Sequence, residues 1–186
     1  MIFNAHSNLR DKHAFLSPSN YHWLNYNDQK LAARFASSMA ARRGSDLHAL
    51  AHEAIRLGVK LSKSNKAMSS YVNDAIGYKM DAEVTLYYSD NCFGTADTIC
   101  FRRGVLRIFD LKTGIIATSV KQLEVYAALF CLEYGYSPFD INFDLRIYQR
   151  EDIREFETSP QVIFEIMETI IDFDRQIQML RERGEW

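Results

Sequence analysis

Apolar residues recur every three or four positions in several stretches of the chain, which is the spacing of one face of a helix. Ser17-Pro18 has the form of an N-cap followed by a first-turn proline, and Gly58 and Gly135 stand where helices are expected to end. The last of these stretches is amphipathic and acidic, and we expect it to cover the core or to join subunits. Helices are predicted over 17–24, 29–36, 47–57, 66–80, 119–134 and 160–183, with 42–46 leading into the third.

From Asp81 the pattern changes to the two-residue alternation of β-strands. Ser137-Pro138 breaks the chain before the last of them, in which Ile141, Phe143 and Leu145 alternate with polar residues. Strands are predicted over 83–88, 93–102, 105–112 and 141–148. Helices followed by strands and then by further helices predict an α/β chain of the mixed, α+β type.

A tight hairpin is predicted at Arg103-Gly104, because a two-residue loop that ends in glycine joins the second and third strands. The register of that hairpin places Ile99 opposite Ile108 and Asp97 opposite Asp110. Side chains directly opposite each other have Cβ atoms about 4.5 to 5.5 Å apart, and two like charges there are destabilising. Something must therefore neutralise the two carboxylates.

The third strand ends in the segment Asp110-Leu111-Lys112-Thr113-Gly114. Side chains alternate along a strand, so Asp110 and Lys112 share a face with the apolar Leu106 and Ile108, while Leu111 points to the other face. A carboxylate and an ammonium on an apolar surface are costly unless something uses them. A divalent cation between the aspartates, with Lys112 adding positive charge, is one solution, and a proton shared by the two carboxylates is the other.

Length and composition bound the class of protein. The 186 residues are 47% hydrophobic and 25% charged, as in one globular domain with a real core. No stretch approaches the roughly 20 apolar residues needed to cross a membrane, and 1–16 lacks a signal-peptide core. Cys92, Cys100 and Cys131 show neither a disulfide framework nor a zinc spacing. We expect a cytoplasmic protein without a membrane partner.

Charge is distributed unevenly along the chain. Residues 1–126 carry 16 basic and 11 acidic side chains, whereas residues 127–186 carry 6 and 13. The basic part holds the candidate chemistry, and a basic surface around an acidic centre suits a polyanionic substrate such as nucleic acid. Scattered solvated charge explains the same numbers equally well.

A set of polar residues follows one order along these predicted elements: His48, Gly94-Thr95-Ala96-Asp97, Asp110-Leu111-Lys112-Thr113-Gly114, and Gln122-x-x-x-Tyr126. Over about 43–148 this order resembles the PD-(D/E)XK nuclease superfamily, and within it the RecB-like and phage exonuclease branch. The resemblance implies a restriction-endonuclease-like core, which is a mixed sheet flanked by helices. The expected organisation is one domain over 1–186, with a helical region 1–40, a nuclease core 43–148 and a C-terminal helix 160–183.

The resemblance also implies roles for single residues. His48, Asp97, Asp110 and the backbone carbonyl of Leu111 match metal-binding positions, and Lys112 matches the catalytic lysine. Gln122 and Tyr126 match the motif that follows and are counted with the catalytic residues. Glu83 begins the neighbouring strand and is a further candidate for a metal or its water shell. Arg43, Arg102, Arg103 and Lys121 are candidate DNA contacts.

The implied activity is hydrolysis of phosphodiester bonds with Mg²⁺ or Mn²⁺, in DNA recombination, repair or phage DNA processing. Oxygen ligands favour these two ions, and one imidazole shifts the preference toward Mn²⁺. The chain has no cysteine after Cys131, so we expect no iron–sulfur cluster, although several relatives hold one. We expect an exonuclease that cuts without sequence preference, with DNA, further subunits or a recombination protein as partners.

Other readings of the same residues stay open. His48 on an apolar helix is often a hydrogen-bonded core residue, and His48 and His52 have the one-turn spacing of a helical zinc pair without a third ligand at metalloprotease spacing. His52 stands where family members often carry a glutamate. Gln122 fits a capping box with Ser119, and Tyr126 fits simple packing. A nuclease-fold module that binds DNA or a partner without cutting is the alternative function.

Overall fold

The computed structural model describes residues 15–16, 18–62, 66–114 and 119–184. The chain divides into two compact units, Met1–Asp46 and Leu47–Trp186, where the sequence predicted one domain with a helical N-terminal region. In the first unit, the described residues form the 3₁₀ helix η2 (Pro18–Asn25) and the beginning of α1 (Asp28–Leu57). The second unit holds the sheet, the remaining helices and most of the predicted site residues.

The helix α1 is continuous where the sequence predicted two helices and a connection, so that prediction is wrong. The segment 37–46 is rich in alanine and arginine, which are good helix formers. Ser45 Oγ donates to the carbonyl oxygen of Ala41 within the helix. Gly44 costs about 1 kcal/mol relative to alanine, which a helix of this length tolerates. Gly58, at φ +67°, ends the helix as predicted, whereas Ser17 lies outside the described residues.

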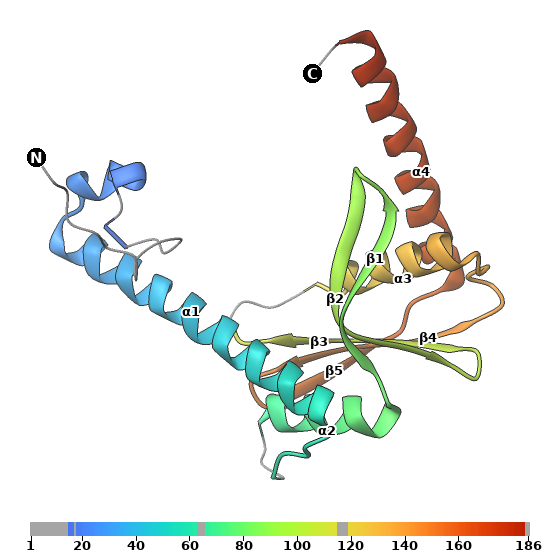
Figure 1. Cartoon of the computed structure of the whole chain (residues 1–186), viewed down its shortest axis with the longest axis horizontal. Helices are drawn as coiled ribbons and strands as arrows, with labels where there is room; N and C mark the ends of the chain where they lie inside the picture. Colours follow the sequence, from blue (N-terminus) through green and yellow to red (C-terminus); the bar gives the residue numbers. More distant parts are fainter. Residues whose placement is uncertain (1–14, 17, 63–65, 115–118, 185–186) are drawn as a thin grey trace, which may run out of the picture. The chain divides into compact units, whose positions relative to one another are not determined.

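Five strands form one mixed sheet in the second unit (Figure 1). Their order in the sheet follows their order in the chain, and only β3 and β4 run parallel. The strands are β1 (Asp81–Ser89), β2 (Cys92–Arg102), β3 (Val105–Lys112), β4 (Asn142–Gln149) and β5 (Asp152–Phe156). The fifth was not predicted, because its two apolar residues, Ile153 and Phe156, are three positions apart and do not show the alternation of a strand. The predicted mixed fold class is confirmed.

Helices cover both faces of this sheet, and each face has its own apolar core. On one face, the end of α1 and α2 (Ala67–Tyr78) pack against Phe109 and Leu111 of β3. On the other face, α3 (Lys121–Tyr134) and α4 (Pro160–Arg183) pack against Leu106 and Ile108. The predicted alternation along β3 is therefore confirmed, and α3 also makes the crossover between the parallel strands β3 and β4.

The hairpin between β2 and β3 has the predicted turn. Arg103 and Gly104 have φ values of +52° and +73°, which is the type I′ arrangement preferred in two-residue loops. The register is the predicted one from Arg102 opposite Val105 to Thr98 opposite Phe109. The turn chemistry of two residues thus fixes the alignment of the two strands that carry the acids.

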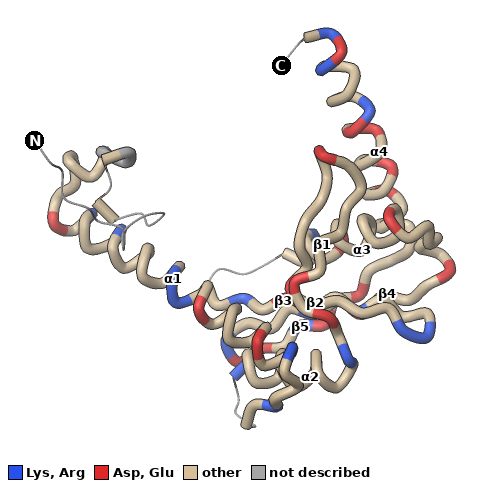
Figure 2. The backbone as a smooth tube through the Cα atoms, viewed as in Figure 1, with Lys and Arg blue, Asp and Glu red and all other residues tan. Residues whose placement is uncertain are grey.

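The helix α4 begins with a Ser159 N-cap whose side chain accepts from the amide of Val162. Its first half is covered, with Ile163 fully buried, whereas its C-terminal part exposes apolar residues such as Phe173. Asp174 accepts hydrogen bonds from Ser89 and Asn91, which ties α4 to the turn between β1 and β2. The charged residues of α4 are all acidic as far as Asp174, and its basic residues lie in the C-terminal part of the helix (Figure 2). Among the described residues, no helix combines the length and the apolar character needed to span a membrane.

Candidate active site

The ladder between β2 and β3 stops where the two predicted aspartates begin. The last paired residues are Thr98 and Phe109, so the pairing ends directly before Asp97 on β2 and Asp110 on β3. The amide of Leu111 donates to Asp97 Oδ2 over 3.1 Å. At this point the Asp97 carboxylate, and not a backbone carbonyl, accepts the hydrogen bond from β3. Asp97 therefore connects β2 to β3 where their backbone pairing ends.

A similar interruption lies between β1 and β2. Ala82 pairs with Thr98 and Val84 with Ala96, but Glu83 and Asp97, which lie between these pairs, are not paired with each other. Glu83 has a φ of +55°, a backbone conformation that non-glycine residues adopt rarely and at a cost. Both breaks in hydrogen bonding thus fall at one level of the sheet, where the three acidic residues Glu83, Asp97 and Asp110 form a row across β1, β2 and β3.

Asp110 is the most deeply buried member of this row, with 2% of its surface exposed. Burial, reinforced by the charge of Asp97, raises the pKa of Asp110 to about 6, although Lys112 acts in the opposite direction. Lys112 Nζ lies 3.0 Å from Asp110 Oδ2, but the approach lacks the alignment of a hydrogen bond. The predicted pair therefore shares one face, and Asp110 Oδ2 is a buried oxygen with unused bonding capacity.

Gln122 and Tyr126 hold the neighbouring groups from α3. Lys112 Nζ donates to Gln122 Oε1 over 3.1 Å. The predicted alternative of a Ser119–Gln122 capping box is not formed, because the Ser119 side chain accepts instead from the amide of Lys121. Tyr126 donates to the Thr95 carbonyl oxygen over 2.6 Å and packs on Gly94, where a Cβ would lie 3.1 Å from the ring. Gln122 thus holds the Lys112 ammonium in position, while Tyr126 holds β2 in position next to Asp97.

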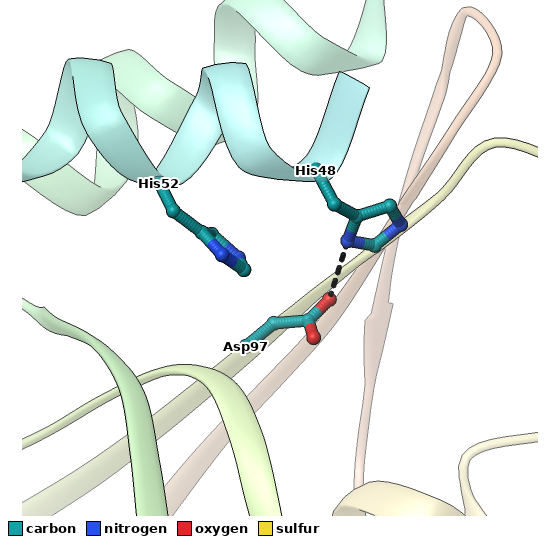
Figure 3. A group of neighbouring side chains, drawn as sticks. All are labelled: His48, His52 and Asp97. Carbon is teal, nitrogen blue, oxygen red and sulfur yellow. Dashed lines mark ion pairs between the residues drawn. The ribbon is translucent and has the colours of Figure 1, made fainter. Parts of the chain in front are cut away.

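His48 and His52 approach the acidic row from α1 (Figure 3). His48 Nδ1 lies 3.5 Å from Asp97 Oδ2. Burial lowers the pKa of His48 below its ordinary value, which His52 and Lys112 reinforce and Asp97 opposes. The neutral imidazole is the form that binds metals, so burial favours the ligand form of His48.

His52 is more buried than His48 and belongs to the same cluster. Its Nδ1 lies 2.9 Å from Glu83 Oε1, but neither ring nitrogen makes a hydrogen bond of acceptable geometry with the described residues. One donor atom from each of His48, His52 and Asp97 lies within 4.8 Å of the other two. The third candidate ligand that the helical spacing lacked thus lies on β2, a strand far along the chain.

Pockets open on two sides of this centre. One, of about 520 Å³, is lined by His52 and Glu83 together with the end of α1 and the start of β1. The other, of about 380 Å³, is lined by Lys112 and by two further cations, Lys66 and Arg150. Neither Lys66 nor Arg150 was predicted from the sequence to be a site residue. The parallel pairing of β3 with β4 would have indicated Arg150, because it follows the residue that pairs with Lys112.

The predicted DNA contacts lie elsewhere. Arg102 and Arg103 lie at the tip of the β2–β3 hairpin. Asp110 lies five residues along β3 from Val105, which is about 17 Å of strand, so the basic tip does not adjoin the acids, and contact of Arg102 and Arg103 with DNA stays a prediction. Lys121 pairs with the buried Glu124 at 2.8 Å. Arg43 is exposed in the first unit, and its contact with DNA stays a prediction.

Leu111 has a different contact from the predicted one. Its side chain is buried in the core beneath α1 and α2, and its amide, not its carbonyl oxygen, is the group that contacts Asp97. The proposed use of the carbonyl as a metal ligand stays a prediction.

No protein-family model, curated protein or solved structure is significantly similar to this chain. The functional argument therefore rests on the residues and their geometry. These define a candidate active site of one buried and one partly exposed aspartate, two imidazoles and one lysine, where the pairing of β2 with β3 ends.

Proposed function

We propose that this chain is a metal-dependent deoxyribonuclease of the PD-(D/E)XK type with a restriction-endonuclease-like core, and that it acts as an exonuclease. The observation that carries the proposal is the burial of Asp110 next to Asp97, with Lys112 on the same face. Two carboxylates and a lysine so placed destabilise the fold unless a ligand uses them.

The donor set fits a divalent cation. Asp97, Asp110 and His48 would hold the ion: the carboxylate oxygens suit both Mg²⁺ and Mn²⁺, and the imidazole nitrogen shifts the preference toward Mn²⁺. Asp110 Oδ2 and His52 Nδ1 have charged neighbours at 3.0 and 2.9 Å but no aligned hydrogen bond, and His52 Nε2 has no hydrogen bond among the described residues, so these buried atoms have bonding capacity for a ligand. When bound, the cation supplies Lewis-acid stabilisation of the phosphate charge and lowers the pKa of water.

The reaction is hydrolysis of a phosphodiester. A bond forms between the water oxygen and phosphorus, the phosphorus–oxygen ester bond breaks, and the departing oxygen takes up a proton to become a hydroxyl. Lys112 lies where its ammonium orients the attacking water or stabilises the added negative charge. Gln122 holds that ammonium by a hydrogen bond, so we assign it a positioning role.

The pocket that Lys112 shares with Lys66 and Arg150 gives DNA a route to the acids. The pocket has three cations against the one acid Glu151, and this positive excess suits a chain of phosphates, since phosphate contacts dominate the affinity for nucleic acid. The apolar lining, which includes Leu47 and Met68, suits the sugar or base of a nucleotide at a DNA end. Access from an end is what an exonuclease requires.

The proposal is tested with end-labelled linear DNA and covalently closed circular DNA of the same sequence. Each is incubated with the purified chain in Mg²⁺, in Mn²⁺ and in chelator. We expect loss of the linear substrate with either cation, no loss with chelator, and sparing of the closed circle. Degradation of the circle assigns an endonuclease instead.

Asp110→Asn and Lys112→Met are the matched variants, because each keeps the approximate size of the side chain and removes its charge. Both are expected to be inactive. Inactivity of the unmodified protein on linear, circular, single-stranded and duplex DNA would contradict the proposal, and DNA binding without cleavage would favour the non-cutting module.

A further inference from the structure

The surroundings of His52 differ from those of an ordinary core histidine, whose ring nitrogens are hydrogen-bonded. It is 9% exposed, yet both of its ring nitrogens are buried without a hydrogen bond of acceptable geometry to the described residues. Buried polar atoms are nearly always satisfied by protein, water or a ligand, because leaving one unsatisfied costs about 1 to 3 kcal/mol. Only Nδ1 has a protein group beside it, Glu83, so Nε2 needs a partner that the described residues do not provide.

The position of Glu83 indicates how His52 is oriented. Glu83 Oε1 lies 2.9 Å from His52 Nδ1, and the positive φ of Glu83 interrupts the β1–β2 pairing at this residue. Histidines that bind metals commonly direct their second ring nitrogen at a carboxylate, which fixes the ring and increases its basicity. Contact of Nδ1 with Glu83 leaves Nε2 as the nitrogen available to an ion.

The cluster around His52 has the dimensions of a metal site. Donor atoms of His48, His52 and Asp97 lie within 4.8 Å of one another. His48 and His52 lie one helical turn apart on α1, and Figure 3 shows both rings directed toward the Asp97 carboxylate. Three protein donors from one helix and one strand leave coordination positions for substrate and water.

We propose that His52, oriented by Glu83, is an additional metal ligand, and that the resulting pair of imidazoles makes the site select Mn²⁺ over Mg²⁺. The inference deepens the proposed function, since it concerns the cation of the same site. Mg²⁺ prefers oxygen ligands and binds imidazole weakly, whereas Mn²⁺ accepts nitrogen donors as well as carboxylates. Each carboxylate replaced by an imidazole shifts the preference toward the transition metal.

The test measures metal binding directly. The full chain, freed of metal with chelator, is titrated with Mn²⁺ while the paramagnetic resonance of the unbound ion is followed, and Mg²⁺ is then added as a competitor. The variants are His52→Ala, His52→Glu, which restores an oxygen donor, and Glu83→Gln. Glu53→Gln is the control, because Glu53 adjoins His52 in sequence but pairs with Arg56 on the exposed side of α1. Circular dichroism shows which variants are folded.

The wild-type protein and Glu53→Gln are expected to bind Mn²⁺ at least about 10-fold more tightly than Mg²⁺. His52→Ala is expected to lose about 10- to 100-fold in Mn²⁺ affinity, and Glu83→Gln somewhat less, because it acts through the ring. In His52→Glu the ratio of Mn²⁺ to Mg²⁺ affinity should fall by about 10-fold. Spin-echo modulation from imidazole nitrogen bound to Mn²⁺ should decrease in His52→Ala and persist in Glu53→Gln.

Unchanged Mn²⁺ affinity and nitrogen modulation in a folded His52→Ala variant would overturn the inference, and so would equal wild-type affinities for the two ions. Cation-dependent DNA cleavage alongside either result leaves the proposed function intact. Conversely, Mn²⁺ binding that depends on His52, in a protein that cuts no DNA, supports this inference and contradicts the proposed function. Absence of any cation binding by the wild type contradicts both.

Discussion

The two ends of the β2–β3 hairpin contrast in structure and in charge. At the tip, a type I′ turn and complete pairing carry Arg102 and Arg103, both exposed. At the other end the pairing stops, and Asp97 and Asp110 sit against His48 and Lys112 with their charges partly or fully buried. The exposed arginines at the tip remain hydrated and do not destabilise the fold. The buried charges at the other end do destabilise it, and for this reason we place the candidate site there. The experiments below separate these two ends.

The largest effect is expected at the buried end. Asp97→Asn, Asp110→Asn and Lys112→Met should each lower the rate of cation-dependent DNA cleavage by at least about 10³-fold, because each removes a charge that binds the cation or stabilises the reacting phosphate. Initial rates on labelled DNA measure the effect. A residual rate within about 10-fold of wild type in any of the three would remove that residue from the proposed machinery.

Asp110→Asn should stabilise the folded protein, although it removes activity. The Asp110 pKa of about 6 lies above the unfolded value of about 3.9, so the folded protein holds a proton that the unfolded chain releases. Stability is therefore lost as pH rises through the interval from about 4 to 6. At pH 7.5 without metal, Asp110→Asn should be more stable than wild type by about 2 kcal/mol, and at pH 4 the gain should be small.

Urea unfolding of the two proteins in chelator, at both pH values, measures this difference. Added Mn²⁺ should stabilise the wild type more than the variant. A difference in unfolding free energy that does not change with pH would show that the Asp110 carboxyl is not destabilised by its surroundings.

A smaller effect is expected from the group that positions the lysine. Gln122→Leu removes the acceptor of the Lys112 hydrogen bond without changing a charge. We expect kcat to fall by about 10- to 100-fold with KM within about twofold, because the ammonium is misplaced while DNA binding is kept. Steady-state kinetics distinguish this from a structural role, which would be seen as reduced unfolding free energy. Gln122→Glu, which keeps an acceptor, should recover part of the rate.

The cations beside the site should matter for binding more than for the reaction. Lys66→Gln and Arg150→Gln are each expected to weaken DNA binding by roughly 5-fold and to reduce the salt dependence by about one phosphate contact. Fluorescence anisotropy in Ca²⁺, over a series of salt concentrations, measures both. An unchanged salt dependence in both variants would move the path of DNA away from this pocket.

The smallest effect is expected at the hairpin tip. Arg102→Gln and Arg103→Gln should leave the cleavage rate within about twofold and the unfolding free energy within about 0.5 kcal/mol. Arg103→Asn should stabilise the chain slightly, because asparagine tolerates the positive φ of this turn position. Loss of DNA binding in the tip variants would show that the basic tip contacts the substrate after all.

The sequence contained most of what determines the acidic row. Arg103-Gly104 fixed the register from Arg102 opposite Val105 to Thr98 opposite Phe109, and Asp97 and Asp110 follow where this pairing ends, so their direct pairing stays a prediction. The two-residue period placed Lys112 beside Asp110 and buried Leu111 on the opposite face. These features follow from local rules of turns and strands, which act over a few residues and so can be predicted from sequence.

Other features depend on contacts that no local rule gives. The contact between His52 and Glu83 requires a positive φ at a glutamate and the docking of α1 over β1. Gly44 indicated a connection, but the alanine-rich segment around it is helical. The separation of the hairpin tip from Asp110, in contrast, can be predicted from the sequence, because it follows from the number of residues along β3.

The most direct test of the account compares the buried end and the tip on one substrate. Nucleotide release from end-labelled linear DNA is measured with the wild type, Asp110→Asn and Arg103→Gln at a single Mn²⁺ concentration. The account predicts equal rates for wild type and Arg103→Gln, and no release above the chelator control for Asp110→Asn. Release by Asp110→Asn at the wild-type rate, or no release by any of the three proteins, would contradict it.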